Sequence, residues 1–230
     1  MYRLSSLMEH PTRDEMITVA LGLVRDRGVA GLSVRRLATE LGCPASALYQ
    51  YIANKEELLT LLWDEVIGTV ELPAPSRDNW RQTIVDAAQA IRRSLLPYVT
   101  LYDVMREHPM AGMHTVRFYE RGLGIFTEAG FDPDDIQPLW DMLIDLVLAF
   151  VSYERAWIEH RSDVGVEDQE IAEFYKGLFE DLPPEEYPYF RALGGRFKLK
   201  SSDMTGWFDR AAALMVDGIA AHHPTVRASD

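Results

Sequence analysis

The 230-residue chain is 47% hydrophobic and has a formal net charge of −13, which supports the core of one large or two small domains and argues against a protein that coats nucleic acid regardless of sequence. The single cysteine, Cys43, excludes an internal disulfide and a cysteine metal cluster, so we expect a reducing, cytoplasmic compartment. Residues 1–11 lack the apolar segment of a secretory signal, and the absence of an uncharged eighteen-residue apolar run predicts no membrane span.

The first predicted helix begins after Thr12 and ends at residue 27. Thr12 and Glu15 have the spacing of a capping box, in which each side chain accepts a hydrogen bond from the other residue's backbone N–H. Gly28 suits the position after the helix because glycine tolerates a left-handed backbone. The predicted buried face consists of Ile17, Ala20, Leu21 and Val24.

Residues 32–62 have the pattern of a helix, a tight turn, a second short helix and the start of a third. Ser33 is the candidate N-cap of the first helix within this segment. Gly42 lies where the chain reverses, and Pro44 suits the first turn of the second helix of the segment. Two short helices joined by such a turn form a helix-turn-helix, whose second helix can enter the major groove of DNA.

The second helix is predicted over residues 44–52, with Leu48 and Ile52 pointing inward. The outward surface then consists of Ala45, Ser46, Ala47, Tyr49, Gln50 and Tyr51. Small residues let the backbone approach the groove, and Ser, Gln and Tyr offer donors to phosphates or base edges. Asn54 and Glu57 open a third helix, predicted to end at residue 68, whose free N–H groups beside Lys55 suit a phosphate.

This ordered set resembles the amino-terminal DNA-binding domain of the TetR family of transcriptional repressors over residues 13–62. The matching residues are Ala20, Gly28, Leu32, Ser33, Arg35, Leu37, Ala38, Leu41, Gly42, Leu48, Tyr49, Asn54, Lys55 and Leu58. The resemblance implies a base contact for Arg35, phosphate contacts for Ser33, Tyr49 and Lys55, and an exposed recognition face for Ser46, Ala47 and Gln50. Tyr51 stands where many relatives have Phe or His.

Charge is divided unevenly along the chain: residues 1–55 have a net charge of +2, whereas residues 56–230 have −15. The acidic part repels phosphate, so DNA contact is expected through the amino-terminal end. We therefore predict a helix-turn-helix domain in residues 1–68 and a larger ligand-binding and dimerisation domain in residues 76–230, separated by a linker that contains Pro73 and Pro75.

The remaining segments have helical periodicity, and no alternating strand pattern extends over more than a few residues, so the predicted fold class is all-α. We expect helices over residues 76–95, 98–107, 113–129, 133–160, 168–181 and 203–222. Gly130 is expected to end the third of these, and a proline-rich break is expected to follow the fifth.

The apolar surfaces of two of these helices predict self-association. Residues 142–151 are apolar on all sides apart from Asp145, and the last helix combines large apolar residues with Ala211, Ala212, Ala213 and Gly218, which permit close packing. A second copy, or an unusually buried monomeric core, explains this pattern. The family resemblance implies a homodimer through residues of about 133–160 and 203–222, on a near-palindromic operator with half-sites roughly 34–36 Å apart.

The middle helices contain adaptable or aromatic side chains of the kind that line pockets for small apolar or aromatic ligands. The candidates are Met105, Met113, Phe118, Trp140, Phe150, Tyr153 and Trp157. The same residue types fill ordinary helical cores; the resemblance to the family is what implies an inducer pocket here. Asp103, Glu107, His108 and His114 place polar groups nearby, but we predict neither a metal site nor a cofactor.

The sequence thus predicts a ligand-responsive repressor that binds double-stranded operator DNA as a homodimer. A transcriptional activator of the same fold, a helical adaptor and an enzyme are the alternatives. The chain lacks a nucleophile elbow, a phosphate-binding glycine loop, a zinc helix motif and a Cys–His pairing. The carboxylate pair Asp141 and Asp145 fits a solvated helix face, so we expect no enzymatic activity.

Overall fold

The computed structural model describes residues 11–105, 112–164, 168–193, 203–223 and 226. Within these ranges, the side chains of residues 103–105, 159–164, 168, 169, 172 and 193 are not described. The described residues form helices and contain no strand, which confirms the all-α fold class.

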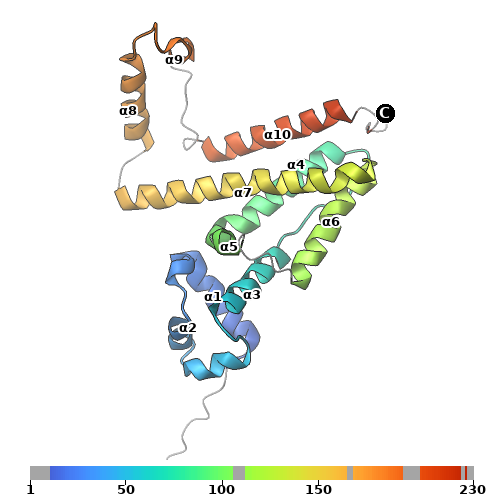
Figure 1. Cartoon of the computed structure of the whole chain (residues 1–230), viewed down its shortest axis with the longest axis vertical. Coiled ribbons are helices and arrows are strands. Elements are labelled where there is room, and N and C mark those ends of the chain that lie inside the picture. Colours follow the sequence, from blue (N-terminus) through green and yellow to red (C-terminus); the bar gives the residue numbers. More distant parts are fainter. Residues whose placement is uncertain (1–10, 106–111, 165–167, 194–202, 224–225, 227–230) are drawn as a thin grey trace, which may run out of the picture.

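The amino-terminal helices form a small bundle, which we call the head (Figure 1). Its elements are α1 (Arg13–Arg27), the 3-10 turn η1 (Val29–Gly31), α2 (Val34–Glu40), the 3-10 segment η2 (Ala45–Gln50) and α3 (Lys55–Gly68). The other elements are α4 (Trp80–Leu95), η3 (Leu96–Tyr98), α5 (Val99–Met105), α6 (Met113–Ala129), α7 (Pro133–Val164), α8 (Asp168–Glu180), α9 (Pro188–Leu193) and α10 (Met204–His222).

Local capping fixes where the helices of the head begin. The Thr12 hydroxyl accepts a hydrogen bond from the Glu15 N–H at 3.2 Å, and the Glu15 carboxylate accepts one from the Thr12 N–H at 2.8 Å, which confirms the predicted capping box. Ser33 accepts from the N–H three residues further on at 3.2 Å. Asn54 accepts from the Glu57 N–H at 2.8 Å, so α3 starts where its cap predicts.

The segment after α2 differs from the predicted α-helix. Pro44 has an extended backbone, and the Ala47 N–H donates to the Pro44 carbonyl at 2.9 Å, three residues back, so η2 winds as a 3-10 helix. A 3-10 helix has three residues per turn and a different angular spacing from an α-helix. Ala47 is nevertheless buried, with 7% of its surface exposed, because its small side chain lies against the head, so its predicted outward placement is wrong.

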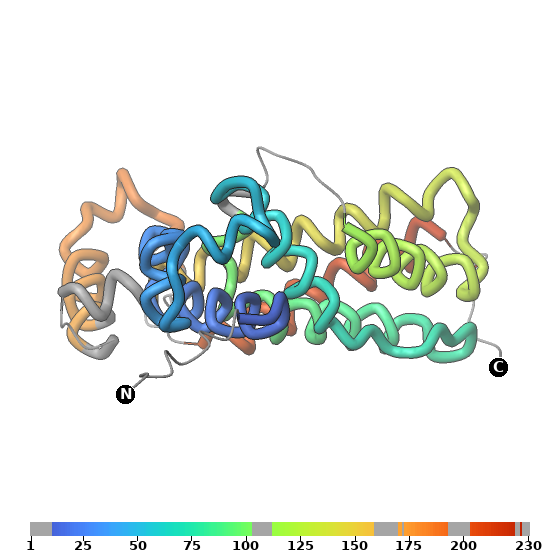
Figure 2. Tube along the Cα trace, turned by 90° about the horizontal axis from the view of Figure 1, so that it is seen from below, coloured from blue at the N-terminus to red at the C-terminus, as the bar shows by residue number. Residues whose placement is uncertain are grey.

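The body consists of α4–α7 and α10. There α4 packs against α7 and α10, and α6 packs against α7. Figures 1 and 2 show α8 and α9 standing apart from these helices, at the end of α7 remote from α6. A single buried apolar cluster continues from the head into the body through α3 and the linker, where Val66, Ile67, Val70 and Leu72 are buried.

Two segments differ from the predicted elements. The Ser76 hydroxyl accepts from the Asn79 N–H at 3.2 Å and forms a turn, so α4 begins at Trp80 rather than at Ser76. The short helix α9 lies within the segment predicted as a proline-rich break. By contrast α6 ends at the predicted glycine, where Gly130 has a φ of 90°.

By length and composition alone, residues Pro133–Ile158 of α7 are apolar enough to cross a membrane. In the structure this helix runs through the middle of the body and packs against α4, α6 and α10. Its apolar character is therefore accounted for by its position as a core helix.

Candidate nucleic-acid interface and effector domain

Three elements of the head contribute the predicted DNA-contacting residues. Ser33 and Arg35 are exposed at the start of α2, and Lys55 is exposed at the start of α3. On η2 and directly after it, Ser46, Tyr49 and Gln50 are exposed, Ala45 and Tyr51 are half-buried, and Ala47 is buried. In Figure 1, α2 and the segment that follows it lie at the end of the molecule opposite α10, so the body leaves this surface open.

Hydrogen bonds within the head hold several of these side chains in place and leave some of their polar atoms available to contact DNA. The Gln50 side-chain amide donates to the Ala47 carbonyl at 2.9 Å, which leaves its amide oxygen as an acceptor. The Ser33 hydroxyl accepts as the N-cap and keeps its O–H as a donor. The Lys55 ammonium lies 3.5 Å from the Val29 carbonyl, so its charge is held beside the N-terminus of α3.

Two of the seven predicted ligand residues come together. Phe118 on α6 and Trp140 on α7 are buried, with ring centroids 5.2 Å apart, and Tyr119 packs edge-on to Trp140 at 6.3 Å. The Trp140 indole N–H is buried and has no hydrogen-bond partner among the described residues. Burial and, after it, the nearby Asp141 and Asp145 raise the pKa of Tyr119 above its ordinary value.

The other predicted ligand residues do not join this aromatic group. Phe150 packs edge-on to Phe208 of α10, with ring centroids 5.4 Å apart, at the junction of α4, α7 and α10. Met113 is 62% exposed, Tyr153 is 41% exposed, and Trp157 is half-buried near the far end of α7. Met105 is placed only by its backbone on α5, because its side chain lies outside the described residues.

The described residues line two open grooves. One, of about 490 Å³, lies between α6 and α7 and includes Glu120, Leu123 and Ile136. The other, of about 400 Å³, lies between α7 and α10 and includes Met142, Leu214 and Ile219. Neither contains any of the seven predicted ligand residues. The second groove lies between the two helices that the sequence identifies as self-associating.

One buried ion pair connects the helices of the body. The Arg92 guanidinium on α4 binds the Glu154 carboxylate on α7 at 2.8 Å, and both side chains are less than 15% exposed. The same guanidinium lies 5.2 Å from the ring centroid of Phe208 on α10. Arg92 therefore fixes the relative positions of α4, α7 and α10, and sequence reasoning did not identify it because its partners are more than sixty residues away.

Family models match most of the chain. The model described as "Bacterial regulatory proteins, tetR family" matches residues 16–62, and the one described as "Tetracyclin repressor-like, C-terminal domain" matches residues 72–223. An HTH-type transcriptional regulator of Saccharopolyspora erythraea is 30% identical over 210 residues, which cover 91% of this chain and 85% of that protein. The tetracycline repressor protein class A from transposon 1721 of Escherichia coli is 29% identical, with 92% of each chain covered.

Solved structures of similar proteins have the same fold. The TetR family protein ActR of Streptomyces coelicolor, in complex with actinorhodin, superposes with a TM-score of 0.79 and 25% identity, over 92% of this chain and 96% of that one. The complex of ActR with (S)-DNPA gives a TM-score of 0.76 at 25% identity, over 92% and 98% of the two chains.

Proposed function

Because this chain belongs to the TetR family of transcriptional regulators, we propose that it is a ligand-responsive, cytoplasmic repressor that acts as a homodimer on a near-palindromic operator. The single observation that carries this proposal is the open polar surface of the head, which combines the start of α2, η2 and the start of α3. An enzymatic role is the weaker alternative, since the comparisons point to regulatory proteins.

The contacts of this surface with DNA divide by chemistry. Arg35 reaches a base edge in the major groove, where a guanidinium can donate two hydrogen bonds to guanine. Ser33, Tyr49 and Lys55 bind phosphates and set the register of the head on the duplex. Ser46 and Gln50 face the bases from η2. Ala47 is removed from this set as a direct contact because it is buried, and its small side chain lets η2 pack closely on the head.

Dimerisation uses two seams on α7 and α10, whose residues are exposed apart from the half-buried Leu146 and Ala211. On α7 the seam consists of Met142, Leu146, Ala149, Tyr153 and Ala156, and on α10 it consists of Trp207, Ala211, Leu214, Gly218 and Ala221. Both sets have alternating spacings of four and three residues, which is the repeat that lets helices pack side by side in a bundle. Met142, Trp207 and Leu214 are each more than 40% exposed, an unusual position for such large apolar residues.

The ligand proposed for the body is a small aromatic molecule that carries a hydrogen-bond acceptor. Phe118, Tyr119 and Trp140 offer ring faces and edges, and the buried Trp140 N–H can donate to an acceptor atom. The ActR complexes with actinorhodin and (S)-DNPA support the general idea of a small-molecule effector in a related protein.

Regulation follows from two mutually exclusive conformations. In one, the two heads have the spacing of successive major grooves, and in the other, a ligand in the body shifts α3 and moves the heads out of register. The ligand weakens DNA binding only as much as DNA weakens ligand binding, typically by about 1–3 kcal/mol.

A salt series on the DNA upstream of the protein's own gene tests the proposal. A repressor should bind one site within this fragment, and its affinity should fall steeply with salt while its preference over random DNA persists. Protection of two half-sites about one helical turn apart would support the dimer. Binding that is absent, or equal for random DNA, would contradict the proposal and favour an adaptor or an enzyme.

A further inference from the structure

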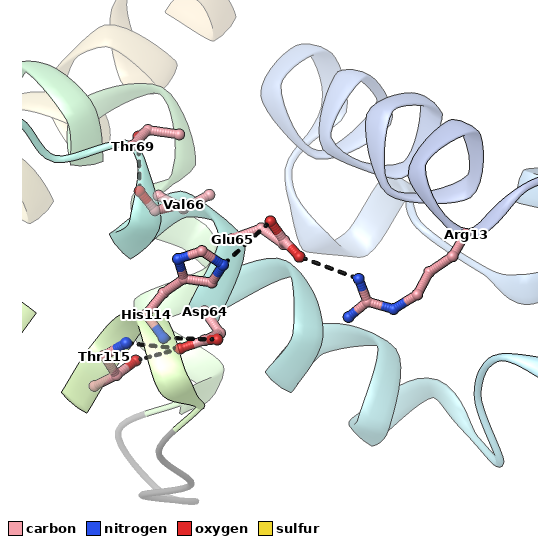
Figure 3. Close-up of polar contacts among 7 residues, drawn as sticks. All are labelled: Arg13, Asp64, Glu65, Val66, Thr69, His114 and Thr115. Atoms are coloured by element: carbon pink, nitrogen blue, oxygen red, sulfur yellow. Dashed lines mark hydrogen bonds and ion pairs between the residues drawn. The ribbon is translucent and has the colours of Figure 1, made fainter. Parts of the chain in front are cut away.

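Beside the apolar cluster, the joint between the head and the body contains a group of polar contacts centred on Asp64 of α3 (Figure 3). One carboxylate oxygen of Asp64 accepts hydrogen bonds from the Thr115 N–H and from the Thr115 hydroxyl, both at 2.8 Å. The other oxygen accepts from the His114 N–H at 3.3 Å. Both residues lie in the first turn of α6, so a side chain of the head binds the N-terminus of a helix in the body.

This turn of α6 has no cap of its own. The N-cap residue is Gly112, which has no side chain, and the first turn contains no acidic residue. The first N–H groups of a helix have no acceptor within the helix, and they carry partial positive charge. Asp64 therefore supplies from fifty residues away the cap that other helices obtain from the preceding residue, as α1 does from Thr12.

Two glycines permit this close approach, one from each side. A Cβ atom at Gly112 would collide with the Asp64 carboxylate, and a Cβ atom at Gly68 would lie 2.6 Å from the His114 ring. Thus Gly112, at the start of α6, lies against Asp64 of α3, and Gly68 of α3 lies against His114 of α6. The fit leaves little space for α3 and α6 to slide past one another while the cap remains in place.

A second pair of contacts surrounds the cap but is weaker. Glu65 on α3 lies 3.4 Å from the Arg13 guanidinium on α1 and 3.9 Å from the His114 ring on α6 (Figure 3). These side chains are between a quarter and a half exposed, and ion pairs of that kind contribute at most about 1 kcal/mol. The three hydrogen bonds to Asp64 are therefore the main polar connection.

The packing around the joint favours transmission from α6 to α3. The α3 helix packs more extensively against α6 than against α1, its neighbour within the head. A displacement of the start of α6 must then move α3 or break the cap, because dense packing passes on displacements.

We propose that Asp64 is a positioning residue that couples the orientation of the head to the order of the first turn of α6. With the cap in place, the turn is helical and the head is held in one orientation. When a ligand shifts α6, the cap breaks, the turn loses order and the head is released. This inference rests on the proposed function for the homodimer and for the consequence at the operator; the cap itself is testable without DNA or ligand.

The first experiment measures hydrogen exchange by NMR at the backbone N–H groups of His114 and Thr115 in the full chain labelled with ¹⁵N-His and ¹⁵N-Thr. In Asp64→Ala, both N–H groups lose their acceptor and should exchange about 10-fold faster, which is the loss expected for a helix cap. Gly112→Ala should give a similar acceleration with the carboxylate still present. Glu56→Ala, which removes an exposed carboxylate at the other end of α3, should leave both rates unchanged.

The second experiment measures the distance between the two heads by electron spin resonance. A nitroxide label is attached at Glu40→Cys, an exposed position on α2, in a Cys43→Ser background. The distribution of distances should be narrow in this parent protein and broader by several ångströms after Asp64→Ala, whereas Asp64→Asn, which keeps an acceptor oxygen, should lie between the two.

The outcomes separate the two hypotheses. Unchanged exchange at His114 and Thr115 in Asp64→Ala would overturn the cap, and unchanged head distances would overturn the coupling, even if the wild-type protein binds its operator. A wild-type protein that binds no DNA would instead contradict the proposed function, and the exchange rates would still decide the cap.

Discussion

The head and the seams of α7 and α10 differ in how far their large apolar side chains are buried. In the head, Leu37, Leu48, Leu58 and Leu62 are fully buried within the chain itself, and the surface is polar. On the seams, Met142, Trp207 and Leu214 are each more than 40% exposed, although α7 and α10 also contribute buried residues to the body. The apolar core of the head is thus covered within one chain, whereas the proposed dimer would cover the outer face of the body with a second copy.

Substituting a charged residue into a seam should have the largest effect. Leu214→Glu places a carboxylate at a position that is 59% exposed in the single chain and buried in the proposed dimer. Because both copies carry the change, the dimer should weaken by at least about 4 kcal/mol, or roughly 1,000-fold in the dissociation constant. Sedimentation should then detect monomers. The matched control is Leu178→Glu on α8, which is 45% exposed and lies off both seams, and dimers that survive Leu214→Glu would contradict the assignment.

A core substitution in the head tests whether its apolar residues are buried within one chain. Leu62→Ala removes a fully buried side chain from α3 and should lower the free energy of unfolding by about 2–5 kcal/mol, measured by urea denaturation. Leu61→Ala, on the same helix but half-buried, should cost less than half as much. Equal losses for the two variants would show that the head is not packed as described.

The DNA-contacting surface gives a smaller effect that separates specificity from general affinity. Arg35→Ala should cost about 1–3 kcal/mol on the operator and relax the preference at one base position. Lys55→Ala should weaken all sequences alike and reduce the salt slope by about 1. Arg25→Ala, which removes an equal charge from the end of α1, is the control, and similar behaviour of all three variants in a binding assay would refute these roles.

The capping box of α1 gives the smallest effect. Hydrogen bonds from the Thr12 N–H and hydroxyl hold the pKa of the Glu15 carboxyl below its ordinary value of 4.5. A lowered pKa means that the carboxylate stabilises the fold above the ordinary value and that this contribution is lost as pH falls through the folded value. The melting temperature of Glu15→Gln should lie below that of the wild type at pH 7, and the difference should shrink toward pH 3. A difference that is constant with pH would argue against the box.

Local signals predicted the parts of the fold that depend on neighbouring residues. The caps at Thr12, Ser33 and Asn54 and the turn at Gly42 are each determined by a few adjacent residues, and the structure confirms them. The burial of Ala47 was missed because it depends on how closely η2 packs against the rest of the head, which the adjacent residues do not determine.

Contacts between distant residues were beyond sequence reasoning. Asp64 has the spacing of an ordinary solvated helix residue, and nothing nearby in sequence indicates that it caps α6. The predicted ligand residues illustrate the same limit, because aromatic residues such as Phe150 and Trp140 have similar sequence patterns but lie in different environments. Whether they contact a ligand remains a prediction.

The unbroken apolar cluster that runs through Val66, Ile67 and Val70 has a consequence for protein engineering. Cutting the chain after α3 would leave these side chains facing water, so an excised head would aggregate or bind other surfaces. Chimaeras that pair the head with a foreign sensor should therefore be joined after α6, so that α3, the linker and the α6 surface against which α3 packs are transplanted together.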